Sequence, residues 1–107
     1  MAEAAVFTLL ARAGRAKGDG LPKGATGAAL LLYVAARDEA SAARDAAAIL
    51  KDAGLAVLEI EGLGSRAERE TAGETFEPED IALMERAAAE NAVIVALMEP
   101  EYGEGEA

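Results

Sequence analysis

The sequence predicts an α+β fold: a two-layer α/β sandwich of ferredoxin-like type, with two helices on one face of a sheet of about four strands. Two segments are apolar on both alternating faces, as central strands are. Two others carry apolar residues at the three- and four-residue spacing of a helix, and two weaker strand patterns complete the order ββαβαβ. The expected elements, in chain order, lie at 4–11, 28–35, 38–53, 55–61, 78–91 and 92–98.

The first two expected strands flank a long loop. In segment 4–11, Val6, Phe7 and Thr8 favour strand over helix. Segment 28–35 has large apolar residues on both faces, which predicts a central strand. The residues between them, 12–27, are rich in glycine and in basic side chains, so we expect a flexible basic loop there.

The first expected helix has start and stop residues of its own. Asp38 has the chemistry of an N-cap, and Gly54 suits a left-handed residue just past the helix end. The strand that follows, 55–61, alternates, so that Glu59 and Glu61 share one polar face.

After the third expected strand comes a polar, glycine-punctuated stretch at 62–76, for which a long loop and an exposed hairpin both fit. Pro78 suits the first turn of a second helix, and Asn91 suits its C-cap. Residues 92–98 form a last expected strand, which is apolar on both alternating faces like segment 28–35. We expect residues 99–107 to be an acidic, flexible tail.

Two architectures fit this order of elements. With both helices on one face, the other apolar face of the central strands needs cover, and we expect a second copy of the chain to supply it in a homodimer. In a three-layer α/β fold with helices on both faces of a mostly parallel sheet, the monomer covers its own apolar surface. The polar face at Glu59 and Glu61 favours the first architecture.

Composition narrows the classes of function. A chain of 107 residues fits a single domain, residues 1–98, followed by the tail. A net charge of −10 and a content of four aromatic residues argue against nucleic-acid binding, because the charge repels phosphates and few rings can stack on bases. Without Cys, His or Trp the chain has no thiolate or imidazole for catalysis or zinc binding, and we expect no cofactor.

The sequence also leads to expectations about cellular location. The N-terminal residues have no basic lead, so we expect no secretory signal and a cytoplasmic location. No apolar run approaches the roughly 20 residues that a bilayer requires, so we expect no membrane contact.

The first candidate site is a group of cations in the glycine-rich loop, where backbone amides beside cations could bind a small anion or an acidic partner. It consists of Arg12, Arg15, Lys17 and Lys23. The spacing matches neither a P-loop, which leads into a helix rather than a strand, nor the dinucleotide fingerprint. A plain connecting loop is therefore the favoured interpretation.

The second candidate site is a carboxylate group made of Asp38, Glu59 and Glu61. Such residues could bind magnesium or act as an acid/base pair. Acidic residues occupy 20 of the 107 positions, however, so a solvated strand face explains the pattern better. We therefore assign no metal ligand and no catalytic residue.

These observations favour a non-enzymatic interaction or regulatory domain that is homodimeric through its open sheet face and binds a protein partner or a small anionic effector. The alternative is a small carboxylate- or magnesium-dependent enzyme acting on a phosphate-containing metabolite. The first is favoured because the side chains that most often do chemistry are missing. One pocket lined by the loop, Asp38 and the two glutamates would favour the second.

Overall fold

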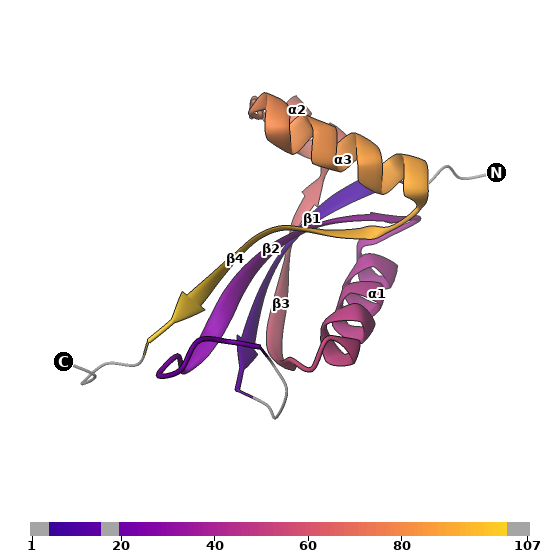
Figure 1. The fold of residues 1–107 in the computed structure, drawn as a ribbon. Helices are drawn as coiled ribbons and strands as arrows, with labels where there is room; N and C mark the ends of the chain where they lie inside the picture. The colour runs from indigo at the N-terminus through magenta and orange to yellow at the C-terminus, as the bar shows by residue number, and fades with distance from the viewer. Residues whose placement is uncertain (1–4, 16–19, 103–107) are drawn as a thin grey trace.

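The computed structural model describes residues 5–15 and 20–102. They form a sheet and three helices, shown in Figure 1. The strands lie in the order β3-β1-β2-β4, and all three pairings between them are antiparallel. The elements are β1 (Ala5–Gly14), β2 (Gly27–Ala36), α1 (Glu39–Asp52), β3 (Ala56–Ser65), α2 (Arg66–Thr71), α3 (Pro78–Glu90) and β4 (Val93–Glu101).

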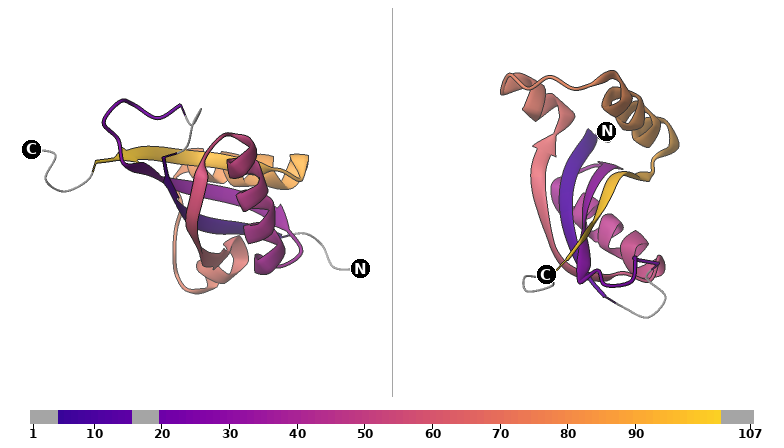
Figure 2. Two further views of the ribbon diagram at one scale, coloured as in Figure 1. Left: turned by 90° about the horizontal axis from the view of Figure 1, so that it is seen from below. Right: turned by 60° about the vertical axis from the view of Figure 1, so that its left-hand side comes forward.

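The ferredoxin-like prediction is wrong. Helix α1 lies on one face of the sheet, and α2 and α3 lie over the other (Figures 1 and 2). The physical reason is that α3 buries Met84 and Ala87 against Tyr33, whose side chain points away from α1. The three-layer alternative, with its mostly parallel sheet, is also wrong, because every pairing is antiparallel. The fold is α+β, and α2 is a third helix that the predicted order lacks.

The larger core lies between α1 and the sheet. Leu9 of β1 and Leu32 of β2 are direct partners across the strands and are both fully buried. Helix α1 packs on this face through Ala42, Ala46 and Leu50, whose small members let the helix approach the sheet closely. The prediction that 28–35 forms a central strand is confirmed, since β2 lies between β1 and β4.

The smaller core lies under α3. Its buried members are Tyr33, Met84 and Ala87, and partly buried apolar side chains such as Phe76 and Ile94 pack against them. Because this cluster has fewer buried apolar members than the cluster under α1, this face of the sheet is held by less apolar burial.

The ends of α1 and the start and end of α3 lie at the capping residues that the sequence predicted. Asp38 caps α1, and its carboxylate accepts a hydrogen bond of 2.7 Å from the backbone N–H of Ser41. Gly54 follows α1 with φ of 88°, in the left-handed region that favours glycine. Pro78 begins α3, and Asn91 ends it in the left-handed conformation.

Three segments differ from the prediction. β1 continues to Gly14 and β4 continues to Glu101, so both strands extend into segments predicted as loop and tail. The stretch 62–76 is neither a long loop nor a hairpin, because β3 runs to Ser65 and α2 follows it. Ser65 and Glu68 form a capping box that starts α2. The parts of the predicted loop and tail at 16–19 and 103–107 lie outside the described residues.

Within the described ranges, no helix combines the length and the apolar character needed to cross a membrane.

Candidate interaction surface

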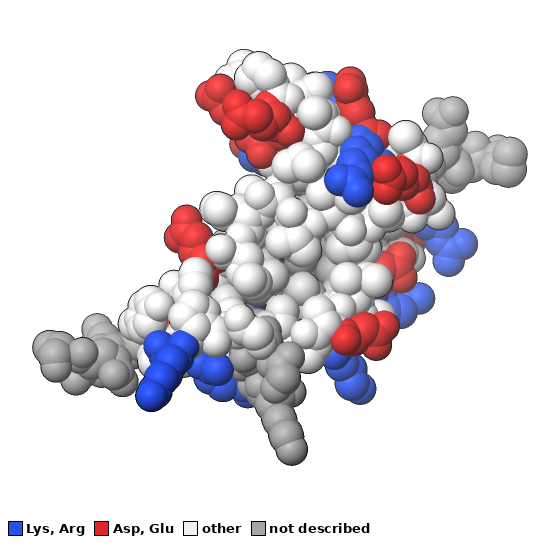
Figure 3. All heavy atoms as spheres, viewed as in Figure 1, with Lys and Arg blue, Asp and Glu red and all other residues white. Residues whose placement is uncertain are grey.

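Apolar side chains gather on the α1 side of β4, which is an edge strand. Val95 is the partner of Leu32 and Met98 is the partner of Leu30, so both point to the face that α1 covers elsewhere. Their exposed fractions are 46% and 45%, and Ile49 of α1 is 47% exposed. Together with Val93 these residues form the β4 surface. Figure 3 shows a broad region without charged side chains between α3 and α1.

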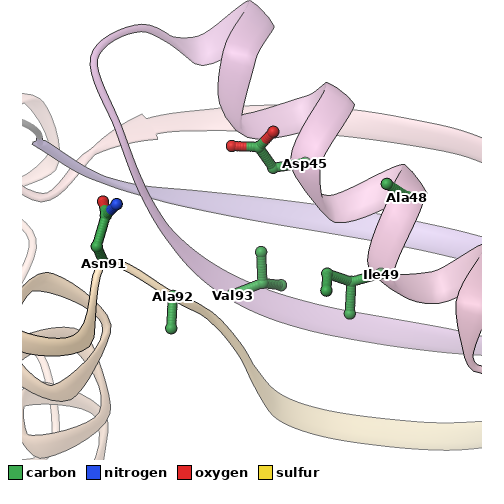
Figure 4. Close-up of a pocket in the computed structure, with 6 residues that line it drawn as sticks. All are labelled: Asp45, Ala48, Ile49, Asn91, Ala92 and Val93. Carbon is green, nitrogen blue, oxygen red and sulfur yellow. The ribbon is translucent and has the colours of Figure 1, made fainter.

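A hollow of about 410 Å³ lies at one end of the β4 surface. Figure 4 shows Val93 pointing across it toward α1, and Ile49 pointing from α1 toward β4. Two polar side chains, Asp45 and Asn91, lie at its rim, and the rest of its lining is apolar. The α1 side of β4 therefore has apolar surface that this chain leaves uncovered.

No strand of the described residues pairs with the outer edge of β4, and near the start of the strand backbone groups point outward. The N–H of Ala35 donates to the carbonyl of Ala92 at 3.3 Å, so Ala92 points its backbone toward β2. Because this direction alternates along an antiparallel strand, Val93 and Val95 point their backbone groups away from β2. Further along, the register shifts at Ala96 and Pro100 has no N–H to donate, so the regular free edge is short.

A cluster of polar side chains fastens α2 and α3 to the other face of the sheet. The Tyr33 hydroxyl donates to the Asp80 carboxylate at 2.8 Å, which joins β2 to α3. Arg69 of α2 donates to the Thr8 hydroxyl at 2.7 Å and to Glu74 at 2.8 Å. We call Thr8, Tyr33, Arg69, Glu74 and Asp80 the polar cluster.

The electrostatics of the polar cluster mark it as a structural contact. Burial, with the neighbouring Asp80 carboxylate, raises the pKa of Tyr33 to about 12. The Arg69 guanidinium also lies over the Phe76 ring, 4.8 Å from its centroid. Among the described residues, no buried side-chain nitrogen or oxygen lacks a hydrogen-bond partner. The cluster thus uses its polar groups to hold the fold together.

Comparison with known proteins places the chain in a family. A family described as "Domain of unknown function (DUF8846)" matches residues 6–102. The chain belongs to this family. No curated protein matches the chain, and no solved structure does. The match extends from β1 to the end of β4, so the whole described sheet and all three helices form the DUF8846 domain.

Of the predicted cations, the structure of this DUF8846 domain describes Arg12, Arg15 and Lys23. Arg12 lies on β1 and pairs with Glu101 at 3.3 Å. Arg15 donates to the carbonyls of Pro22 and Ala25, both at 2.9 Å, and so closes the loop on itself. Lys23 is exposed, and Lys17 lies outside the described residues.

The predicted carboxylate group is split between the two sides of the sheet. Glu59 and Glu61 share one face of β3, beside Arg12 and Leu10 of β1. Asp38 caps α1, which lies over the opposite face. In the part of the chain that the structure describes, no three acidic residues form a group that could hold a metal ion. The common pocket that would favour an enzyme is not formed by these residues.

Sequence reasoning missed the polar cluster and the exposure of the β4 surface. Thr8 and Tyr33 are polar residues inside apolar strands, which signals that each needs a partner. Nothing in the pattern says that Arg69 and Asp80 supply those partners. The doubly apolar pattern of 92–98 indicated a central strand, whereas the structure places β4 at the edge of the sheet.

Proposed function

We propose that this DUF8846 domain is a non-enzymatic interaction domain that forms a homodimer through the β4 surface. The observation that carries the proposal is the group of half-exposed apolar side chains, Ile49, Val95 and Met98, beside a free strand edge. Complete burial of such a side chain contributes roughly 1.5–3 kcal/mol, so half of that value remains for association. An exposed apolar patch next to an unpaired edge favours pairing with another chain.

Antiparallel pairing of two β4 strands satisfies the free backbone groups. With a two-fold axis at Ile94, Val93 of each copy lies opposite Val95 of the other, and the outward N–H and C=O groups exchange hydrogen bonds. The axis is perpendicular to the sheet, so α1 of both copies lies on the same side. Ile49 of each copy then flanks a continuous apolar strip over the paired strands.

The charge distribution along β4 is compatible with self-association, even though the chain carries a net charge of −10. Residues 92–98 are uncharged, and the acidic residues Glu99 and Glu101 follow them. In an antiparallel pair these glutamates lie at opposite ends of the interface, so like charges do not face each other across the axis. The bulge at Ala96 and the proline at 100 limit the pairing to the first part of the strand.

This contact replaces the one that the sequence predicted. The predicted homodimer used a sheet face left open by helices on the other side, whereas α2 and α3 cover part of that face. The homodimer, the regulatory role and the cytoplasmic location stay predictions. Because Arg12 and Arg15 hydrogen-bond within the chain, we do not include a small anionic effector in the proposal.

Light scattering after gel filtration tests this proposal, with two matched lysine variants. Val95→Lys places a charge on each side of the proposed axis and should convert the dimer into a monomer at micromolar concentration. Leu58→Lys changes a more exposed leucine, on the opposite edge strand β3, and should leave the dimer intact. A monomeric parent protein, or equal effects of the two substitutions, would refute the β4 dimer.

A further inference from the structure

Within the described residues, the sheet face that carries α2 and α3 is covered by helices at one end. In Figure 2, right, both helices lie over the end of the sheet where β1 starts, and the other half of this face has no helix in front of it. Strand register aligns one row of side chains across this uncovered half: Glu61, Leu10, Leu31 and Leu97. The next row consists of Glu59, Arg12, Ala29 and Glu99.

These two rows form what we call the lower sheet face, together with Leu58 and Glu101. Leu10 and Leu97 are exposed there, and Leu58 is 69% exposed where it lies over Gly14. A shallow hollow of about 210 Å³ lies between Arg12, Leu58 and Glu59. The face thus combines three exposed leucines with four glutamates and one arginine.

The charge of this face decides what can cover it. Four glutamates and Arg12 give it a net charge of −3, and Arg12 is already paired with Glu101. A second copy of the same face, a nucleic acid or an anionic membrane would bring like charge onto it. Residues 20–26 of the chain's own loop lie on the other side of the sheet, where Leu21 and Ala25 join the core under α1. A cationic partner remains.

We propose that the lower sheet face binds a cationic amphipathic helix of a partner protein. The three leucines at Leu10, Leu31 and Leu97 span two strand spacings, roughly 10 Å. Residues i and i+7 of a helix are separated by about 10.5 Å, so three apolar side chains on one helix face can follow the row across the strands. Lysine or arginine residues beyond the apolar side chains then lie near Glu61 at one end and Glu99 at the other.

This proposal does not depend on the β4 dimer, because the lower sheet face and the β4 surface point to opposite sides of the sheet. Leu97 pairs with Leu31 and faces the α3 side, whereas Val95 and Met98 face α1. In the β4 dimer both lower sheet faces stay uncovered. Each dimer would then bind two helices.

Fluorescence anisotropy with a labelled synthetic peptide tests the proposal. The probe is a helical peptide of leucine and lysine whose leucines follow one face, and a peptide of the same composition in shuffled order is its control. The parent protein should bind the amphipathic peptide at near-physiological salt and bind the shuffled peptide at least about fivefold more weakly. The affinity should fall as salt rises, since exposed charge pairs contribute.

Paired substitutions locate the binding face. Glu59→Gln with Glu61→Gln should weaken binding at least about fivefold, as expected for two lost surface charge pairs. Glu79→Gln with Glu85→Gln makes the same charge change on exposed residues of α3 and should alter affinity less than about twofold. Equal weakening by both double variants, or equally tight binding of the shuffled peptide, would overturn the proposal.

Two further variants test the leucine row and its independence from the dimer. Leu97→Ser removes one leucine of the row and should also weaken binding at least about fivefold, and an unchanged affinity would contradict the apolar row. Val95→Lys, which tests the dimer, should bind the peptide within about threefold of the parent. A parent protein that is monomeric but binds the peptide would therefore refute the proposed homodimer alone, whereas a dimeric parent that does not bind the peptide would refute the helix-binding proposal alone.

Discussion

Tyr33→Phe is the substitution that most directly tests how α3 is held to the sheet. The side chain is buried, and its hydroxyl donates to Asp80 at 2.8 Å. The phenyl ring fills the same space, so the substitution removes the hydrogen bond with little change in packing. A hydrogen bond to a charged group contributes about 1.5–3 kcal/mol to the free energy of unfolding, so we expect a loss of roughly 2 kcal/mol at pH 8.

The contact between Tyr33 and Asp80 makes a pH-dependent contribution to the free energy of unfolding, and its sign follows from the pKa of Tyr33. Folding raises the pKa of Tyr33 from 10.0 to about 12, so between these values the unfolded chain has lost a proton that the folded chain still holds. Stability therefore falls as pH rises through this window, and the contribution is fully present below pH 10. Each pKa unit corresponds to 1.36 kcal/mol, which gives a loss on the order of 2–3 kcal/mol across the window.

Urea unfolding of both proteins between pH 8 and pH 11.5 measures this contribution. The difference in unfolding free energy between the parent and Tyr33→Phe should shrink steadily above pH 10. Tyr102→Phe is the matched control, because it removes the chain's other tyrosine, which is 57% exposed. It also leaves Tyr33 as the only source of tyrosinate absorbance. A difference that stays constant with pH, or ordinary titration of Tyr33 in the folded Tyr102→Phe protein, would refute the reasoning.

Three other substitutions, two of them with matched control variants, probe the fold. Leu32→Ala, in the fully buried centre of β2, should cost about 2–5 kcal/mol by urea unfolding, and a near-neutral result would contradict its central position. Arg69→Ala should cost about 2–3 kcal/mol because it breaks the polar cluster, whereas Arg66→Ala, in the pair with Glu70, should cost less than about 1 kcal/mol. Gly27→Ala should lower the thermal midpoint because its Cβ would collide with the Ala13 carbonyl. In Gly62→Ala the nearest atoms to the new Cβ belong to the movable Glu39 carboxylate, so the midpoint should change little. Similar shifts for both variants would count against this geometry.

The helix ends could be predicted from single residues because capping is a local effect. Asp38, Gly54 and Asn91 occupy the expected positions at the ends of α1 and α3. Helix α2 could have been found in the same way, since Ser65 and Glu68 have the spacing of a capping box. The polar, glycine-rich composition of 62–76 concealed this signal.

The sides on which the helices pack could not be predicted from the sequence. The apolar stripe of α3 indicates that Met84 is buried, but β2 is apolar on both faces and offers two surfaces for it. The contacts that decide between these surfaces, from Tyr33 to Asp80 and from Thr8 to Arg69, join residues far apart in the chain. Local patterns do not record such pairings.

The candidate interaction surfaces could not be predicted from local sequence patterns either. The sequence indicated leftover apolar surface on a sheet face without helices, whereas helices pack on both faces and exposed apolar side chains lie on the edge strand β4. The carboxylates Glu59 and Glu61 were correctly placed on one face of β3. Their relation to Leu10 and Leu97 required the strand order β3-β1-β2-β4.

Amide hydrogen exchange on β4, measured by NMR over a range of protein concentrations, tests the proposed homodimer most directly. The N–H groups of Val93 and Val95 point away from β2 and become protected only when a second strand pairs with them. We predict that their exchange slows at least about tenfold as the protein is concentrated, while edge amides of β3 exchange at a constant rate. Rapid exchange of both valine amides at every concentration would contradict the β4 dimer.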